Sequence, residues 1–217
     1  MKKLLAVAVA AAIIVAGYFG YQQHTETAFL DTLTPHLKNA SIRVTNSSEL
    51  EIKPSQATFK EVFDRLDVDV TEIEKHLIEV QSISSSKTEK LSSPAIAYLR
   101  AAQEFSRALS MKYRKRLAAS NSLDRYRDAL KDRFAASGYG YEHAKDRSDR
   151  ASEDVDKAVA ESRESTKDLQ KATASLKAAR AAAASHFPDD ALVATKQLDE
   201  VIASNAEKPK PDVAAKK

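Results

Sequence analysis

The sequence predicts an all-α protein, with an N-terminal membrane-spanning helix followed by an elongated antiparallel helical hairpin in a coiled-coil bundle. Four observations predict this architecture. A seam of residues in alternating steps of four and three runs without a break from Ala144 to His186, and that spacing keeps one face of a helix turned toward a partner. A second long periodic segment precedes it, and an uncharged apolar run lies near the N-terminus. The 217-residue chain has no Trp and few aromatic residues, which suits long helices better than a thick globular core.

The apolar run covers residues 4–21, and we expect residues 1–21 to form a signal-anchor helix that crosses the inner membrane once. Two lysines precede the run, and the residues that follow it, as far as Leu37, contain no Lys or Arg. The positive-inside rule therefore places the N-terminus in the cytoplasm and the C-terminal domain in the periplasm. The run is at the lower limit of the length that spans a bilayer. The alternative is a signal peptide that is cleaved after Gly17.

Residues 22–57 are predicted to form a membrane-proximal helix and a connector. Thr34 and Pro35 have the pattern of a helix start, with a capping hydroxyl followed by proline at the first helical position. Hydrophobic and polar residues then alternate between Ile42 and Ile52. This alternation predicts one short β-ribbon, and an irregular connector is the alternative.

Residues 58–205 are predicted to form the helical bundle. Its first helix starts at a capping box near Thr58, carries large branched residues in steps of four and three, and ends near Ile83. A short helix that starts at Pro188 closes the bundle. The composition of the basic tail, residues 206–217, is typical of disordered segments.

The centre of the bundle is predicted to be a long hairpin with helices at 94–136 and 141–186. Gly138 and Gly140 mark its tip, because glycine readily adopts the left-handed conformation that follows a helix end. Nine of the thirteen seam residues in the second helix are Ala or Ser, so we expect the first helix to supply the bulk between them. A partner helix from another subunit is the alternative occupant of this seam.

Folding the hairpin about position 139 predicts which residues face each other. Large residues of the first helix then lie beside small residues of the second: Phe134 near Ala144, Leu130 near Ser148, and Leu123 near Val155. The helix before the hairpin is rich in acids and the first hairpin helix is rich in bases, so Asp64, Asp67 and Asp69 are expected to face the segment from Arg107 to Arg116.

One basic region is the strongest candidate binding site, and it consists of Arg107, Lys112, Arg114, Lys115 and Arg116. Clustered cations of this kind can bind a polyanion or lipid head groups. Consecutive helical positions point in all directions around a helix axis. The alternative interpretation is therefore a solvated stretch that faces the acidic helix.

The sequence offers no pattern for catalysis or for a cofactor. It contains no cysteine and no glycine-rich phosphate loop, and no two of its five histidines have the i,i+4 spacing that brings imidazoles together on one helix. We therefore expect no catalytic residues, no metal ligands and no small-molecule substrate. A net charge of +3 gives no indication of nucleic-acid binding.

These observations predict a non-enzymatic membrane protein whose exported coiled-coil domain is a scaffold, spacer or docking element for envelope components. Its helical faces would bind a protein partner or a second copy of the chain. The alternative is a secreted or periplasmic helical binding protein with a cleaved signal peptide, which would contact a polyanion or lipid head groups through the basic region.

Overall fold

The computed structural model describes residues 2–52 and 59–206, with side chains from residue 24 onward except those of Ile52 and Lys60. The elements are α1 (Lys2–Ile52), α2 (Phe59–Ile83), α3 (Glu89–Ala135), α4 (Tyr139–Ala183), the short 3-10 helix η1 (Asp189–Ala191) and α5 (Thr195–Asn205). The described residues contain no strand, which confirms the all-α class.

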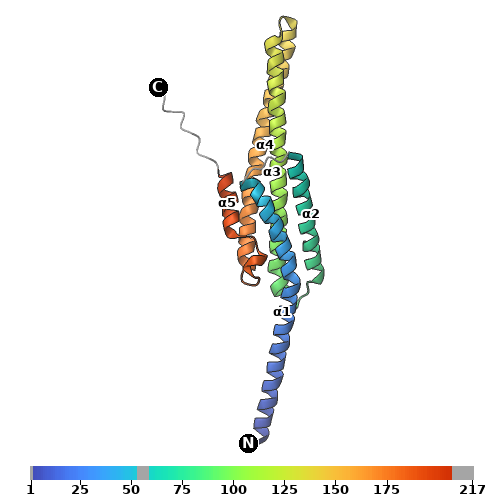
Figure 1. The fold of residues 1–217 in the computed structure, drawn as a ribbon, viewed down its shortest axis with the longest axis vertical. Coiled ribbons are helices and arrows are strands. Elements are labelled where there is room, and N and C mark those ends of the chain that lie inside the picture. The colour runs from blue at the N-terminus through green and yellow to red at the C-terminus, as the bar shows by residue number, and fades with distance from the viewer. Residues whose placement is uncertain (1, 53–58, 207–217) are drawn as a thin grey trace, which may run out of the picture.

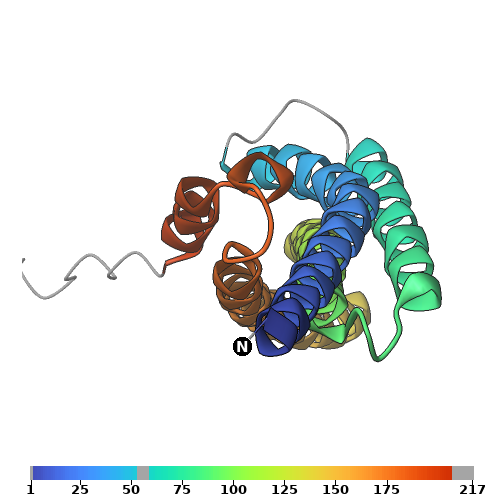
Figure 2. The same cartoon turned by 90° about the horizontal axis from the view of Figure 1, so that it is seen from below.

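Helix α3 is the axis of the molecule. It contacts α1, α2 and α4, while α5 packs on α1 and α4, and the end view shows these helices arranged around α3 (Figure 2). In the side view, the first half of α1 projects from one end of the bundle and the distal halves of α3 and α4 project from the other end (Figure 1). The molecule is therefore long, with a single helix at one end and a two-helix hairpin at the other.

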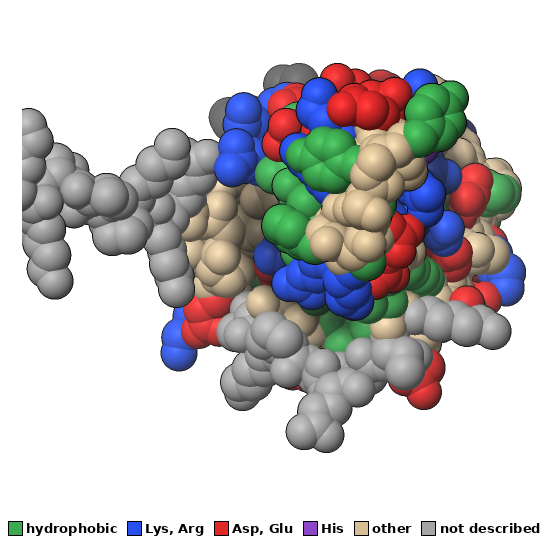
Figure 3. All heavy atoms as spheres, turned by 90° about the horizontal axis from the view of Figure 1, so that it is seen from above, with side chains coloured by type: hydrophobic (Ala, Val, Ile, Leu, Met, Phe, Trp, Pro, Cys, Tyr) green, Lys and Arg blue, Asp and Glu red, His purple; other side chains and the backbone are tan. Residues whose placement is uncertain are grey.

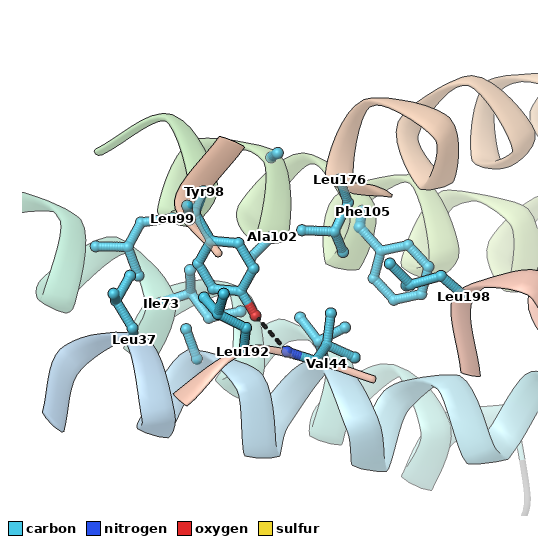
Figure 4. Packing of buried hydrophobic residues seen from close by; sticks show 14 of the residues in the cluster. Leu37, Val44, Ile73, Tyr98, Leu99, Ala102, Phe105, Leu176, Leu192 and Leu198 are labelled. Atoms are coloured by element: carbon cyan, nitrogen blue, oxygen red, sulfur yellow. Dashed lines mark hydrogen bonds between the residues drawn. The ribbon is translucent and has the colours of Figure 1, made fainter. Parts of the chain in front are cut away.

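The hydrophobic core lies where these helices meet, and Tyr98 shows how its polar atoms are satisfied. Tyr98 and Phe105 of α3 are fully buried, together with Leu176 of α4 and Leu198 of α5. The Val193 backbone N–H donates a hydrogen bond to the Tyr98 hydroxyl at 3.0 Å (Figure 4). A buried phenol needs such a partner, and this one fixes the segment between η1 and α5 to the central helix.

Helices α3 and α4 form the predicted antiparallel hairpin. Arg147 of α4 pairs with Asp132 of α3 at 2.8 Å near the tip. Lys115 of α3 pairs with Glu161 of α4 at 2.7 Å nearer the bundle. Both pairs are close to symmetric about position 139, so they confirm the predicted fold point.

The small-residue seam of α4 also lies as predicted. Every seam position from Ala144 to His186 is buried or half-buried, so helices of the same chain cover this face. At the tip, Gly138 has the positive φ, 58°, that favours glycine, but its ψ is −135° and it is the N-cap of α4. The predicted left-handed helical residue at the end of the first helix is therefore not found, since α3 ends at an extended Ala136. Gly140 lies in the first turn of α4.

The distal part of the hairpin packs differently from the prediction. Phe134 is 84% exposed and does not fill the space beside Ala144, and Leu123 is also exposed. The buried residues of α3 on this stretch are the small ones, Ser122 and Ala129. Small residues on both helices allow the two backbones to lie close together, so bulk is not needed between them.

The predicted helix boundaries need two corrections. Helix α3 begins at Glu89, ahead of the predicted start at 94, and Pro94 lies inside it. Leu91 and Ala95 are buried on the same face, so packing continues the helix across the proline. The predicted helix after Pro188 is divided into η1 and α5.

The predicted β-ribbon between Ile42 and Ile52 is wrong, because this segment is the end of α1. The helix has a seam in steps of four and three whose members are all buried: Leu33, Leu37, Ala40, Val44, Ser47 and Glu51. Two of these core positions carry polar residues, which hides the helical period in the sequence. Ile42, which produced the apparent alternation, is 50% exposed.

Pro35 likewise does not start a helix but lies inside α1. Its side chain is on the exposed face of the helix. The Thr34 hydroxyl does not cap an N-terminus, since it donates a hydrogen bond to the Leu30 carbonyl at 2.8 Å. A preceding helical turn is therefore already formed where the sequence suggested a new start.

The backbone of the predicted membrane span, residues 4–21, is part of α1. The side chains of these residues are not among those that the structure describes. Among the residues whose side chains are described, no helix offers an apolar stretch long enough to cross a bilayer. The end of the predicted connector, residues 53–57, and the tail, residues 207–217, also lie outside the described residues.

Candidate functional site

The structure places the five residues of the basic region on different sides of α3. Arg107 and Arg114 face α2, where they pair with Glu74 at 3.4 Å and with Asp67 at 2.5 Å. Lys115 faces α4 and pairs with Glu161. These contacts neutralise three of the five cations within the chain.

The acidic partners come from the helix that the charge pattern predicted. Asp67 of α2 accepts hydrogen bonds from Arg114 and, at 3.1 Å, from the Ser110 hydroxyl, which confirms the predicted contact of this acid. Asp69 turns the other way and pairs with Arg43 of α1 at 3.0 Å. Arg116 is exposed and has no ion-pair partner among the described residues.

Lys112 is the buried member of the basic region, with 1% of its side chain exposed. Its ammonium group donates hydrogen bonds to the Glu51 carboxylate of α1 and to the Asn205 side-chain carbonyl of α5. Burial lowers the pKa of Lys112, opposed by the hydrogen bond to Glu51. Lys112 therefore joins three helices and is not accessible to a polyanion.

Tyr113 lies beside this buried group and ties α3 to the end of α1. Its hydroxyl donates a hydrogen bond to the Leu50 carbonyl at 2.9 Å. Burial raises the pKa of Tyr113 to about 12, and the nearby Glu51 carboxylate adds to the shift. The phenol therefore stays protonated under ordinary conditions and serves as a permanent donor.

The hairpin tip, residues 133–143, exposes several aromatic side chains. Phe134 and Tyr139 are 84% and 83% exposed. The Arg133 guanidinium lies 5.7 Å from the centre of the Tyr141 ring, and the His143 ring packs edge-on to Tyr139 at 5.0 Å. Viewed onto this end of the molecule, hydrophobic side chains lie among charged ones (Figure 3). Contiguous apolar patches that are rimmed by polar residues are typical of interaction surfaces.

The tip stands well clear of the bundle. The ring of Phe59, the first residue of α2, is 6.5 Å from the ring of Tyr113, so α2 covers α3 only up to this level. The remaining part of α3, as far as Ala135, is about 33 Å long at 1.5 Å per residue. This length separates the exposed aromatic side chains from the core.

A third cluster joins α1 and α2, and the sequence analysis missed it. The Nδ1 atoms of His36 and His76 are 3.1 Å apart. The Glu79 Oε2 atom lies 3.2 Å from the Nδ1 atom of His36 and 3.5 Å from that of His76. Burial lowers the pKa of His36, and His76 lowers it further, while Glu79 opposes both effects.

The histidine pair was missed because only pairs on a single helix were considered. A signal for it exists in the two seams. His36 and His76 each precede a buried leucine, Leu37 and Leu77, so each histidine lies at the rim of its helix interface. Aligning the two seams would have brought the rims together.

The sequence matches no protein-family model, and neither a curated protein nor a solved structure is similar to it. Function is therefore inferred from the shape of the molecule and from its side chains. The features available are the hairpin tip, the basic region and the cluster of His36, His76 and Glu79.

Proposed function

We propose that this is a non-enzymatic, single-pass membrane protein whose exported helical domain is a scaffold, spacer or docking element for components of the cell envelope. Residues 4–21 would cross the inner membrane, with the N-terminus in the cytoplasm and the following residues in the periplasm. The observation that carries the proposal is that the N-terminal helix and the hairpin tip lie at opposite ends of the bundle. The first half of α1 leaves one end of the bundle, and the hairpin tip lies at the other (Figure 1).

Helix lengths give the reach of such a molecule. Helix α3 has 47 residues and is about 70 Å long, and the part of α1 between residue 22 and the bundle adds about 17 Å. The tip would therefore stand about 85 Å from the membrane surface. A spacer of this length must resist bending, and the ion pairs that join α3 to α4 support that property.

Chemistry at the tip favours a protein partner. Phe134 and Tyr139 present large apolar surfaces to solvent, and aromatic side chains are enriched at the centres of protein interfaces. Arg133 beside Tyr141 adds a charged group next to the rings. A partner that buries these rings would gain apolar contact area at the point of the molecule farthest from the membrane.

The alternative, a secreted protein that binds a polyanion through the basic region, has less support. Three of the five cations already pair with carboxylates of the same chain, and Lys112 is buried. A polyanion would have to displace these internal acids. Reversing the charges of Arg114, Lys115 and Arg116 should accordingly leave the binding of the protein to a polyanion unchanged. A large loss of this binding would favour the alternative.

Topology can be tested by cysteine labelling, because the natural chain has no cysteine. In cells with a permeable outer membrane, S137C at the tip should react with a membrane-impermeant maleimide, whereas K3C should react only after the inner membrane is broken. Labelling of S137C only after lysis would contradict an exported domain. If the intact mass shows that the mature chain begins at Tyr18, the result would contradict a retained anchor and favour a cleaved signal peptide.

Docking can be tested by photo-crosslinking from single positions in living cells. A photoreactive residue at 134 or 139 should give discrete crosslinked products that mass spectrometry can identify. The control is position 157, an exposed lysine midway along α4, which should give none of these products. If the tip positions give no product, or the same products as position 157, docking through the tip is wrong.

A further inference from the structure

We propose that His36, His76 and Glu79 bind a divalent transition-metal ion of the zinc type, which joins α1 to α2. The three candidate ligand atoms come from two helices and all lie within 4.8 Å of one another. His36 is contributed by α1, and the other two residues lie one helical turn apart on α2. No feature of the membrane anchor or of the hairpin tip enters this inference.

The spacing of the ligand atoms fits a metal ion. The three edges of the triangle are 3.1 Å between the two Nδ1 atoms, and 3.2 Å and 3.5 Å from these atoms to the Glu79 Oε2 atom. Tetrahedral ligands that lie about 2.0–2.1 Å from zinc are about 3.3–3.4 Å from one another. An ion just above the centre of this triangle would therefore reach all three atoms at normal bond lengths, without movement of either helix.

The donor types select the class of ion. Two imidazole nitrogens and one carboxylate oxygen suit zinc and neighbouring transition metals, whereas calcium and magnesium prefer oxygen ligands alone. Three protein ligands leave a fourth position for water. The Glu79 side chain is 58% exposed, while those of His36 and His76 are 20% and 17% exposed. The fourth position can thus face solvent.

Hydrogen bonding alone satisfies this arrangement poorly. A proton on one Nδ1 atom can be donated to the other imidazole, which uses one edge of the triangle, whereas the Glu79 carboxylate lies within ion-pair distance of both rings. A second Nδ1 proton would leave the two N–H groups facing each other at 3.1 Å. A cation at the centre interacts favourably with all three lone pairs at once.

The helices hold these side chains in place before any ion binds. Leu37 and Leu77, which follow the two histidines, are buried in the interface. The imidazole rings are 5.2 Å apart between centres and inclined at 63°. Ligands that project from rigid, packed elements need little reorganisation on binding, so bound zinc should strengthen the contact between α1 and α2.

Metal content of the full-length protein in detergent tests the proposal. After equilibrium dialysis against micromolar zinc, the wild-type chain should retain about one zinc ion, and H36A and H76A should each bind at least tenfold more weakly. The matched control is H24A, which removes an exposed histidine from the same helix as His36 and should bind like wild type. Cobalt(II) should give the absorption of a four-coordinate site in wild type and H24A but not in H36A.

Folding of the variants is checked by far-ultraviolet circular dichroism. If H76A is unfolded, E79Q, which changes one exposed carboxylate to an amide, provides the same comparison and should weaken zinc binding about tenfold. Zinc should also raise the Tm of wild type and leave that of H36A unchanged. The proposal is overturned if wild type binds no zinc below 100 µM, or if folded H36A or E79Q binds zinc as tightly as wild type.

Discussion

The buried Lys112 offers the sharpest test of how this bundle is held together. Its ammonium group is the hydrogen-bonding partner of one Glu51 oxygen, and the other oxygen, Oε2, is buried without a hydrogen bond to the described residues. The Glu51 side chain is only 4% exposed. K112M keeps most of the side-chain volume but removes the charge, so a buried carboxylate would be left without its ion-pair partner.

The expected loss is large. Removing one partner of a buried ion pair lowers the free energy of unfolding by about 3–5 kcal/mol, a substantial part of the 5–15 kcal/mol that is usual for a folded domain. Removing both charges is different, because no unpaired ion remains. The double variant E51L/K112M should therefore recover most of the loss and lie within about 2 kcal/mol of wild type.

Urea unfolding followed by circular dichroism measures these differences, with the slope against urea checked for constancy across variants. R116M is the control, since Arg116 is an exposed cation on the same helix without an ion-pair partner among the described residues, and it should change stability by less than about 0.5 kcal/mol. The reasoning fails if K112M lies within about 1 kcal/mol of wild type, or if E51L/K112M is no more stable than K112M.

Three further predictions concern the tip, the buried phenol and the α2–α3 contact. G138A should lower the free energy of unfolding by about 1–2 kcal/mol because its positive φ disfavours a side chain, whereas G140A, with open space around the added carbon, should be neutral or stabilising in the same urea assay. The pKa of Tyr113 is about 12 in the folded protein and about 10 in the unfolded chain. The contribution of Tyr113 to the free energy of unfolding is therefore complete below pH 10 and declines as the pH rises to 12, by up to about 1.4 kcal/mol per pH unit. Y113F should flatten the stability profile in that window, and an unchanged slope would contradict the assigned shift. R114E should destabilise by about 1 kcal/mol or less through Asp67, and D67R/R114E should restore the loss; a double variant that is worse than either single one would show that these residues do not interact as a pair.

Local patterns in the sequence were sufficient to predict the two long helices of the hairpin and the turn between them. The seam from Ala144 to His186 is periodic over many turns, so its burial could be predicted without knowing the partner. Gly138 marks the turn because few other residues tolerate its positive φ. The antiparallel pairing then followed from the similar lengths of the two helices, and the ion pairs of α3 with α4 confirm it.

The end of α1 could not be predicted in this way. Its core face contains Ser47 and Glu51, and a polar residue at a core position looks like a surface residue until its partners are known. Glu51 is buried because Lys112 of α3, which also donates a hydrogen bond to Asn205 of α5, reaches its carboxylate. The same contact removes Lys112 from the surface where the cluster of bases in the sequence had placed it.

By itself, the sequence determined the helical class, the paired rods and their turn, because these follow from period and backbone preference within one segment. The tertiary structure alone decided which charges are buried and that the Phe134 side chain faces solvent. It also brought His36 into contact with His76, forty residues away in the sequence. Burial and ligand geometry depend on neighbours from other segments. No single stretch of the chain contains that information.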